Sequence, residues 1–460
     1  GDQAGTAVTT GIRNSLVGAE AGMALTNADH NVAIGFRALY ADTLGSKSIA
    51  IGDVALVSQN FTTATDAFNI AIGHEAGNAL TTGVKNTIMG GLAGDGLTTA
   101  DECVIIGYNA GSLVMTGHDN TLVGANAGTD IAGGESNTYI GFSVGSNTTG
   151  GDQNTGMGRD ALFTNTTGSN NTAVGYSALV ANTTAANNSA FGHNALKANT
   201  TGTGNNAFGV QTIDACTTGD YNTAFGHVAL STNVSSDGNT AFGSQVLYAA
   251  TGARNTALGD TAGYAITSGS NNLLLGADAG RTGSPGGNIT TASNILVIGD
   301  ENISASHIQT DWTVASDQRD KTDFTALDLG LDFVNALAPV TYKWDKRSKY
   351  GDKTADDYNL LDQTPDGTHK EDWLDIGFKA QEVQALEEAA GYTTAAKKNL
   401  TVSTAGDGKQ MGLQYSKFVP ILVKAVQELS TALDAAVSAN TALAARVTTL
   451  EDSSNVTLEE

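Results

Sequence analysis

The sequence repeats itself every 17 residues over its first 299 positions. A glycine recurs at a fixed point of each unit, and 14 of the 17 intervals between successive anchor glycines are 17 residues long, the others being 21, 16 and 23. A unit this short cannot bury its own apolar face, so units of this kind are stable only when they stack on one another. The anchors are Gly1, Gly18, Gly35, Gly52, Gly73, Gly90, Gly107, Gly124, Gly141, Gly158, Gly175, Gly192, Gly209, Gly226, Gly243, Gly259, Gly276 and Gly299.

Each unit reads close to Asn-Thr-Ala-φ-Gly-x-x-Ala-Leu, where φ is apolar. Asn stands four residues before the anchor in most units, as in Asn154 and Asn171, and Ala stands three residues after it, as in Ala178. One apolar stretch ends at the anchor and another lies at Ala-Leu, which predicts two brief strands joined by turns of Gly, Asn, Thr and Ser. Stacked at the ~4.8 Å spacing of strands, about 18 coils would form a β-solenoid on the order of 85 Å long.

Alanine at so many inward positions leaves a thin core, which favours several chains packed along one axis. The repeat resembles the head repeats of trimeric bacterial adhesins and the fibre repeats of many phage tail proteins. This resemblance, over residues 1–299, implies a trimeric parallel β-roll. We therefore expect a mainly β fold in which residues 1–299 form a repetitive solenoid shaft. Because Gly1 is already in register, we also expect that upstream sequence, including the part that attaches to a virion, is missing.

The 17-residue register stops after residue 299. Residues 300–315, in which Ile308, Trp312 and Val314 alternate with polar residues, are predicted to form a neck strand or linker. Residues 316–460 are predicted to form a small α+β domain. Its expected elements are a helix from Leu327 to Leu337 that Pro339 ends, a strand over 340–344, a strand leading into a helix over 372–386, and a long final helix over 418–451.

The final helix carries a heptad pattern, which predicts a coiled coil and therefore an oligomer. Asn440 occupies one a position, where a single buried Asn fixes the register of the helices. The alternative is an amphipathic helix that packs on its own domain. The a and d positions are Leu422, Val426, Leu429, Leu433, Ala436, Asn440, Leu443, Val447 and Leu450.

Four motifs follow in order: Ser316-Asp317-x-Arg319-x-Lys321, Tyr342-x-Trp344, Gly377-Phe378-x-Ala380-Gln381-Glu382-Val383, and Tyr415 before a helix. Together they resemble the intramolecular chaperone domain of phage tail spikes and fibres, which is also classed as a self-cleaving peptidase family. The resemblance implies a domain that trimerises, brings three β-rich chains into register and then cuts itself off. It implies Ser316 as the nucleophile, Lys321 as the base and Ala315–Ser316 as the scissile bond. Phe324 departs from the aliphatic residue frequent at that place, in a slot expected to be buried.

The chemistry of these residues agrees with that assignment. A Ser hydroxyl becomes a good nucleophile only when a base takes its proton, and Lys is such a base only if burial or neighbouring cations lower its pKa. Arg319 is a neighbouring cation, but Asp317 and Asp320 oppose it, so burial at a trimer interface would be needed to shift the balance. The expected reaction is a single-turnover cut, with no activity on external substrates. Since this chain retains the downstream part, cleavage is slow or blocked, or the chain is the precursor.

Composition excludes several classes of function. The chain has a formal net charge of −24 and no basic stripe, which argues against nucleic-acid binding. No apolar run reaches 18 residues and no signal peptide is visible, so no membrane span is expected. Cys103, in an Asn position, and Cys216, in a predicted turn, lie too many coils apart for a disulfide. His74, His193 and His227 occupy a variable position after the anchor and should face solvent, so we expect neither a metal nor a cofactor.

We therefore expect a structural and host-surface-binding part of a phage tail fibre or spike. It would be a homotrimer, made in the host cytoplasm and located in the extracellular virion tail, with a host glycan or protein as receptor and other tail proteins as partners. The segments that break the period, 58–68 and 280–292, are candidate receptor contacts, although either can be a tolerated insertion.

Two alternatives remain open. A bacterial trimeric surface adhesin would need an outer-membrane anchor where this chain has its heptad helix. A glycan-degrading tail spike would need paired carboxylates in a groove, and the acidic residues of the shaft are scattered.

Overall fold

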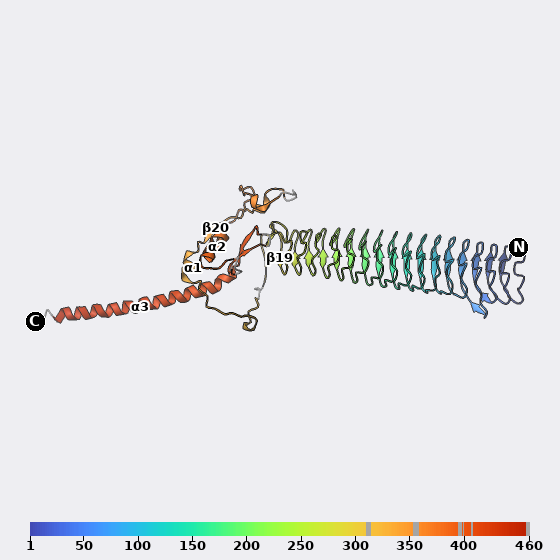
Figure 1. Cartoon of the computed structure of the whole chain (residues 1–460), viewed down its shortest axis with the longest axis horizontal. Coiled ribbons are helices and arrows are strands. Elements are labelled where there is room, and N and C mark those ends of the chain that lie inside the picture. Colours follow the sequence, from blue (N-terminus) through green and yellow to red (C-terminus); the bar gives the residue numbers. More distant parts are fainter. Residues whose placement is uncertain (310–313, 353–357, 394–397, 399, 406–407, 457–460) are drawn as a thin grey trace. The chain divides into compact units, whose positions relative to one another are not determined.

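The computed structural model describes residues 1–309, 314–352, 358–393, 398, 400–405 and 408–456. The chain forms two compact units, one of residues 1–284 and 289–300 and the other of residues 285–288 and 301–460. The first unit is a stack of coils and the second a small α+β domain that ends in a long helix (Figure 1). The predicted mainly β solenoid followed by a small domain is thus confirmed.

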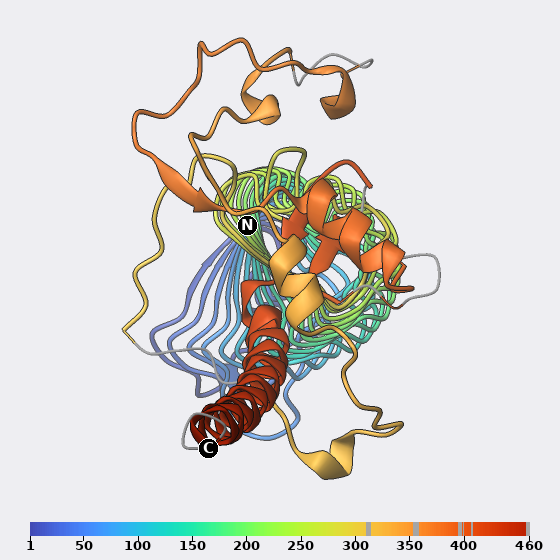
Figure 2. The same ribbon diagram turned by 90° about the vertical axis from the view of Figure 1, so that its left-hand side faces the viewer.

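The solenoid contains one long parallel sheet of 17 three-residue strands, one from each coil. Every strand pairs with its neighbours in the same register, so that equivalent positions of successive coils lie above one another, as in Thr172↔Ser189 and Val174↔Phe191. Figure 2 views this stack nearly end-on, and the coils overlay. The strands are β1 (Ser15–Val17), β2 (Val32–Ile34), β4 (Ile49–Ile51), β6 (Ile70–Ile72), β7 (Thr87–Met89), β8 (Val104–Ile106), β9 (Thr121–Val123), β10 (Thr138–Ile140), β11 (Thr155–Met157), β12 (Thr172–Val174), β13 (Ser189–Phe191), β14 (Asn206–Phe208), β15 (Thr223–Phe225), β16 (Thr240–Phe242), β17 (Thr256–Leu258), β18 (Leu273–Leu275) and β19 (Leu296–Ile298).

The second strand predicted for each coil is wrong, because the Ala-Leu stretch forms turns. In the second full coil Arg37 and Leu39 both take left-handed backbone conformations, with φ of 53°. The N–H of Arg37 donates to the carbonyl of Ala19 in the preceding coil, and the N–H of Leu39 donates to that of Ala55 in the following coil. Bonds to alternate sides hold this wall of the solenoid together without an extended strand.

Buried asparagines form a ladder through the interior of the stack. The backbone N–H of Asn171 donates to Asn154 Oδ1 at 3.0 Å, and Asn171 Nδ2 donates to the carbonyl of Ala185 at 2.8 Å. The Oδ1 of Asn171 in turn accepts from the N–H of Asn188 at 3.0 Å. Each amide therefore joins its own coil to both neighbours, and burial without those bonds would be unfavourable. The recurring Asn is thus a structural residue.

The anchor glycines are required by backbone geometry. Gly175 has a φ of 137°, which residues with a side chain rarely adopt. A Cβ placed there would also collide with the carbonyl oxygen of Gly192 in the next coil. The repeat keeps glycine at this point because two backbones meet there.

Neighbouring coils also compensate for each other in size. Tyr139 occupies the inward strand position that smaller residues fill in other coils, and it is fully buried. Its partner across the ladder is Gly156, where a Cβ would lie 3.1 Å from Tyr139 Cδ1. The Tyr139 hydroxyl lies 3.1 Å from Thr148 Oγ1. This pair makes coils β10 and β11 distinct from all others of the described shaft.

The insertion at 58–68 is anchored in the interior and is not wholly a surface loop. Ser48 stands in the asparagine position, and Gln59 fills the space by donating to Ser48 Oγ at 3.1 Å and to Asp42 Oδ2 at 2.7 Å. Phe61 is buried as well, and burial raises the pKa of the Asp42 carboxyl. Two short strands, β3 (Gly45–Ser46) and β5 (Thr65–Asp66), pair in parallel at its base. Only residues 62–64 form an exposed tip.

Cys216 is not in a surface turn, as was predicted, but takes a place in a second buried amide ladder. Asn182 Nδ2 donates to Asn165 Oδ1 at 2.7 Å, and Asn199 Nδ2 donates to Asn182 Oδ1 at 3.0 Å. Cys216 follows and has no amide, so Asn199 Oδ1 is left without a hydrogen-bond partner. Cys216 and Cys103 are buried free thiols, and burial raises the pKa of each to about 11.

The second unit is built from two short antiparallel sheets and three α-helices. Its described core contains Leu329, Phe333, Val383, Val402, Phe418 and Ile421. Helix α1 begins at Leu331 and not at Leu327, and no strand forms in the described residues of the predicted neck at 300–315; Trp312 lies outside the described residues. The elements are η1 (Gln318–Asp320), α1 (Leu331–Ala336), β20 (Val340–Tyr342), η2 (Arg347–Lys349), η3 (Leu360–Asp362), β21 (Asp375–Gly377), α2 (Ala380–Ala389), β22 (Val402–Thr404), β23 (Met411–Leu413), η4 (Tyr415–Lys417) and α3 (Phe418–Val456), with β20 paired to β21 and β22 to β23.

Among the described residues, no helix combines the length and apolarity that crossing a membrane requires.

Cys216→Asn should stabilise the solenoid. The new Nδ2 would reach the unpartnered Oδ1 of Asn199, and a buried hydrogen bond contributes about 1 kcal/mol. We expect the thermal unfolding midpoint, followed by circular dichroism, to rise by a few degrees, whereas Cys216→Ser, which cannot span the gap, should not raise it. A midpoint that falls with Asn would show that the ladder does not extend through this coil.

Candidate functional site

Ser316 and Lys321 come together at the start of the second unit. Lys321 Nζ donates to Ser316 Oγ at 2.6 Å, because the turn η1 between them folds the segment back on itself. The N–H of Lys321 donates to the carbonyl of Gln318, which closes that turn. The side chains predicted as nucleophile and base are therefore within hydrogen-bonding distance in a single chain.

Arg319 does not act on Lys321 as the sequence suggested. Its guanidinium forms an ion pair with Asp317, with Nη2 to Oδ2 at 2.5 Å and Nε to Oδ1 at 3.1 Å. This pairing lowers the pKa of the Asp317 carboxyl and raises that of Arg319. Asp317 Oδ1 also accepts from the N–H of Arg319 and so begins the turn. Both charged groups hold the conformation of the segment and largely neutralise each other.

The whole segment from residue 314 to residue 326 is exposed, including the predicted scissile bond Ala315–Ser316. Phe324, expected in a buried slot, is 65% exposed. A Lys becomes an effective base through desolvation, and an exposed pair lacks it. The geometry of the pair is thus present, but the burial that would activate it must come from something other than these residues of the same chain.

The downstream motifs gather in one aromatic cluster. Tyr342 and Trp344 meet edge to face at 5.2 Å between ring centroids, and Asp375 Oδ2 accepts from the hydroxyl of Tyr342 and from Trp344 Nε1, both at 3.3 Å. Burial, followed by the Asp375 charge, raises the pKa of Tyr342. Phe378 stacks with Phe418, 5.5 Å away. Residues from β20, β21 and the start of α3 therefore form one assembly.

Gly377 is required by that cluster. The hydroxyl of Tyr415 accepts from the N–H of Phe378 at 3.2 Å. A Cβ on Gly377 would collide with that same hydroxyl. The Gly377-Phe378 motif thus lets Tyr415 approach the backbone between β21 and α2.

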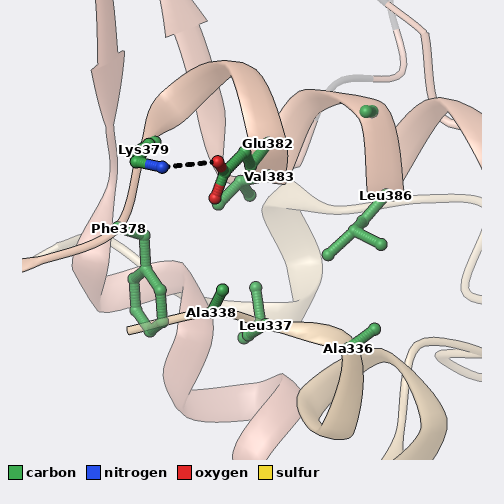
Figure 3. Close-up of a pocket in the computed structure, with 9 residues that line it drawn as sticks. Ala336, Leu337, Ala338, Phe378, Lys379, Glu382, Val383 and Leu386 are labelled. Atoms are coloured by element: carbon green, nitrogen blue, oxygen red, sulfur yellow. Dashed lines mark hydrogen bonds and ion pairs between the residues drawn. The ribbon is translucent and has the colours of Figure 1, made fainter. Parts of the chain in front are cut away.

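Gln381 and Glu382 lie on the exposed side of α2, and Val383 faces the core. Lys379 Nζ donates to Glu382 Oε1 at 2.7 Å (Figure 3). Beside this pair is a cavity of about 300 Å³ lined by Leu337, Phe378 and Leu386 among others. A second cavity of about 620 Å³ shares Phe378 and Lys379 and is lined in addition by Tyr342, Trp344, Met411 and Tyr415.

Helix α3 presents different faces along its length. Phe418, Ile421 and Ala425 are buried against their own domain. Glu428, one turn further, accepts from the N–H of Leu331 at 2.7 Å and so caps the N-terminus of α1. Sequence reasoning missed Glu428, because its partner is 97 residues away and the residue fits an exposed heptad position. Asn440 lies beyond this contact on the exposed part of the helix.

Another buried carboxylate missed by the sequence is Glu387 of α2. It accepts from the N–H of Thr401 at 2.6 Å and from that of Leu400 at 3.2 Å, ahead of β22. It is 1% exposed, so its role is to hold the sheet against the helix.

Comparison with known families explains this arrangement. Residues 316–392 match the Peptidase_S74 family model, the chaperone of endosialidase. The match begins at Ser316, the first residue of the Ser-Lys pair, and extends through β20, β21 and α2. A chaperone domain of this family behind a β-solenoid fits a phage tail fibre or spike. Comparisons with curated proteins and with solved structures gave no significant match.

Other candidate sites carry no comparable geometry. His74, His193 and His227 are exposed. In the part of the chain that the structure describes, no group of three or more His, Cys, Asp or Glu residues is placed to hold a metal ion. The described chemistry of the chaperone domain therefore centres on Ser316 and Lys321.

The cap on α1 predicts a pH dependence. The bond to Leu331, with a smaller effect of Lys424, lowers the pKa of Glu428, so its stabilising effect is present above the ordinary carboxyl pKa and is lost as pH falls through the lowered value. Glu428→Gln should lower the thermal midpoint of the domain at pH 7 and have little effect at pH 3. Glu451→Gln, also on α3, is the matched control and should have little effect at either pH. An equal loss for Glu428→Gln at both values would contradict the cap.

Proposed function

We propose that the chain is the distal, host-contacting part of a phage tail fibre or spike, and that its chaperone domain assembles three chains and then cuts itself off before Ser316. The observation that carries the proposal is the Ser316–Lys321 pair at the first residue of the chaperone match, directly after a shaft with slippery repeats. The shaft would remain in the virion tail and meet a host-surface glycan or protein, while the chaperone is needed only for assembly.

The far part of α3 supports assembly into a trimer. Beyond Glu428 the described side chains of the helix are exposed, and its apolar heptad positions, including Leu433, Leu443 and Leu450, are 61%, 56% and 64% exposed. A long helix with a regular apolar stripe and no partner of its own is the pattern of a coiled coil. The packed helix and the coiled coil are thus not alternatives: the first turns do the former, and the rest is available for the latter.

The sheet of the solenoid supports the same assembly. The residue before each anchor glycine points outward and is always apolar, and Val17, Ile34, Met89, Phe242 and Ile298 among them are 38–59% exposed. Taking roughly 150–200 Å² for a full side chain, this stripe exposes on the order of 1,000 Å². The largest apolar patch of a typical monomer is ~300–600 Å². Such a stripe is best explained by contact with other copies of the chain.

The cut would proceed as an acyl shift followed by hydrolysis. Lys321 would take the proton of Ser316 Oγ, which attacks the carbonyl carbon of Ala315. The Ala315–Ser316 C–N bond breaks as the amine of Ser316 receives the proton, leaving an ester between Ala315 and Ser316 Oγ. Water then opens the ester to a carboxylate at Ala315 and restores the hydroxyl of Ser316. An intact chain is the state before this single turnover.

Cleavage can be tested directly on the purified chain. The wild type should yield residues 1–315 and a fragment that starts at Ser316, whereas Ser316→Ala and Lys321→Ala should stay intact because nucleophile or base is gone. Lys343→Ala, an exposed lysine of the same domain, should still be cut. Mass spectrometry and N-terminal sequencing report the new terminus, and a cut at any other bond, or one that persists in Ser316→Ala, would refute the pair.

The outward stripe can be tested separately. Phe208 and Phe225 stack at 4.4 Å between ring centroids on that face. In a Ser316→Ala background, Phe208→Asp with Phe225→Asp should shift sedimentation from trimer toward monomer, because the carboxylates would be buried between chains. Val234→Asp, at a site 49% exposed outside the strands, is the control and should stay trimeric. A parent chain that sediments as a stable monomer would rule out the assembly.

A further inference from the structure

Phe324 is an apolar side chain without a place in its own chain. It lies eight residues after Ser316 in a segment whose side chains from 314 to 326 are all exposed, and it is itself 65% exposed. The hydrogen bonds between side chains in that segment, such as Lys321 to Ser316 and Arg319 to Asp317, join residues within the segment. Downstream, Leu329 is buried in the domain core and fixes where the segment leaves the domain.

The same domain carries an open aromatic cavity that suits such a side chain. Its volume is about 620 Å³, and its walls come from β20, the start of α2, and β23. Trp344 and Tyr415 in its lining are 44% and 50% exposed, which is unusual for large aromatic groups in a folded domain. In both views the yellow segment around η1 lies apart from α2 and from the β20–β21 strands (Figures 1 and 2).

Charge indicates how the segment would be oriented. Asp320 and Asp323 flank Phe324 on its N-terminal side. Lys379 lines both cavities next to Phe378, and its side chain is 60% exposed. Lys379 has Glu382 at 2.7 Å, and its remaining ammonium hydrogens can accept a further carboxylate. Phe324 in the aromatic cavity would therefore bring Asp323 toward Lys379.

We propose that Phe324 of one chain docks in the aromatic cavity of a second copy, with Asp323 at the partner's Lys379. This inference rests on the proposed chaperone function and adds its regulation: the segment with Ser316 and Lys321 is held and desolvated only when a neighbouring chaperone domain is folded. Cleavage is then tied to assembly, because no chain can complete its own site.

Cross-linking tests the docking without using cleavage. In a Ser316→Ala background, Phe324→Cys with Thr341→Cys, an exposed lining residue of β20, should form disulfide-linked dimers and trimers on non-reducing denaturing gels. Both native thiols are buried and stay silent. Phe324→Cys with Ile376→Cys, 76% exposed on β21 outside the cavity lining, should link at least tenfold less. Links within single chains, or no preference for Thr341, would overturn the proposal.

Mixed assemblies test its consequence for cleavage. One chain carries Thr341→Trp, which fills the cavity, and keeps Ser316, Lys321 and Phe324; the other carries Ser316→Ala and keeps the cavity. Alone, neither should be cut, but on co-expression the first chain should be cut. If the wild type is cut and the co-expressed chain is not, docking between copies is wrong. If the wild type itself is not cut while the cysteine pair links the chains, the failure lies in the proposed self-cleavage and the docking stands.

Discussion

The shaft depends on one interaction, the hydrogen bonding of buried amides from coil to coil. Each coil has a single three-residue strand and an interior rich in alanine, so its hydrophobic gain is small. Asn154, Asn171 and Asn188 bridge successive coils through both ends of the amide group, and the strand and turn N–H groups do the same. Since almost every bond is made to a neighbouring coil, a coil has no stability by itself and the stack forms or fails as a whole.

That economy brings a problem of register. Coils with the same ladder can pair in the wrong order at little cost, because a shift by one unit replaces Asn with Asn and Gly with Gly. Within one chain, Tyr139 against Gly156 and the Gln59 bridge to Ser48 mark two places where a shift would leave a clash or an unpaired amide. The outward stripe has the same apolar character in every coil. Register between chains must therefore be set elsewhere, which is the task of a C-terminal chaperone.

The sequence predicted what depends on period and failed where a contact is distant or the backbone conformation is rare. The spacing of the anchors gave the solenoid and the strand before each glycine, and the apolar spacing gave α3. The Ala-Leu turn was read as a strand, because left-handed residues such as Leu39 leave no compositional mark. Cys216 was misplaced since its ladder is visible only when Asn165, Asn182 and Asn199 are stacked. Glu428 and the exposure of Phe324 depend on tertiary structure that no local pattern encodes.

The seam between shaft and chaperone shows how a chain can carry a reactive pair without reacting at once. The turn η1 places Lys321 beside Ser316 by local geometry alone, and the Asp317–Arg319 pair stiffens that turn while cancelling its own charge. What a water-exposed Lys lacks is desolvation, and a short polar segment cannot supply it to itself. Positioning is thus encoded in ten residues, while activation needs a surface that exists only after folding and assembly. A cut governed in this way removes the chaperone only once its work on the shaft is done.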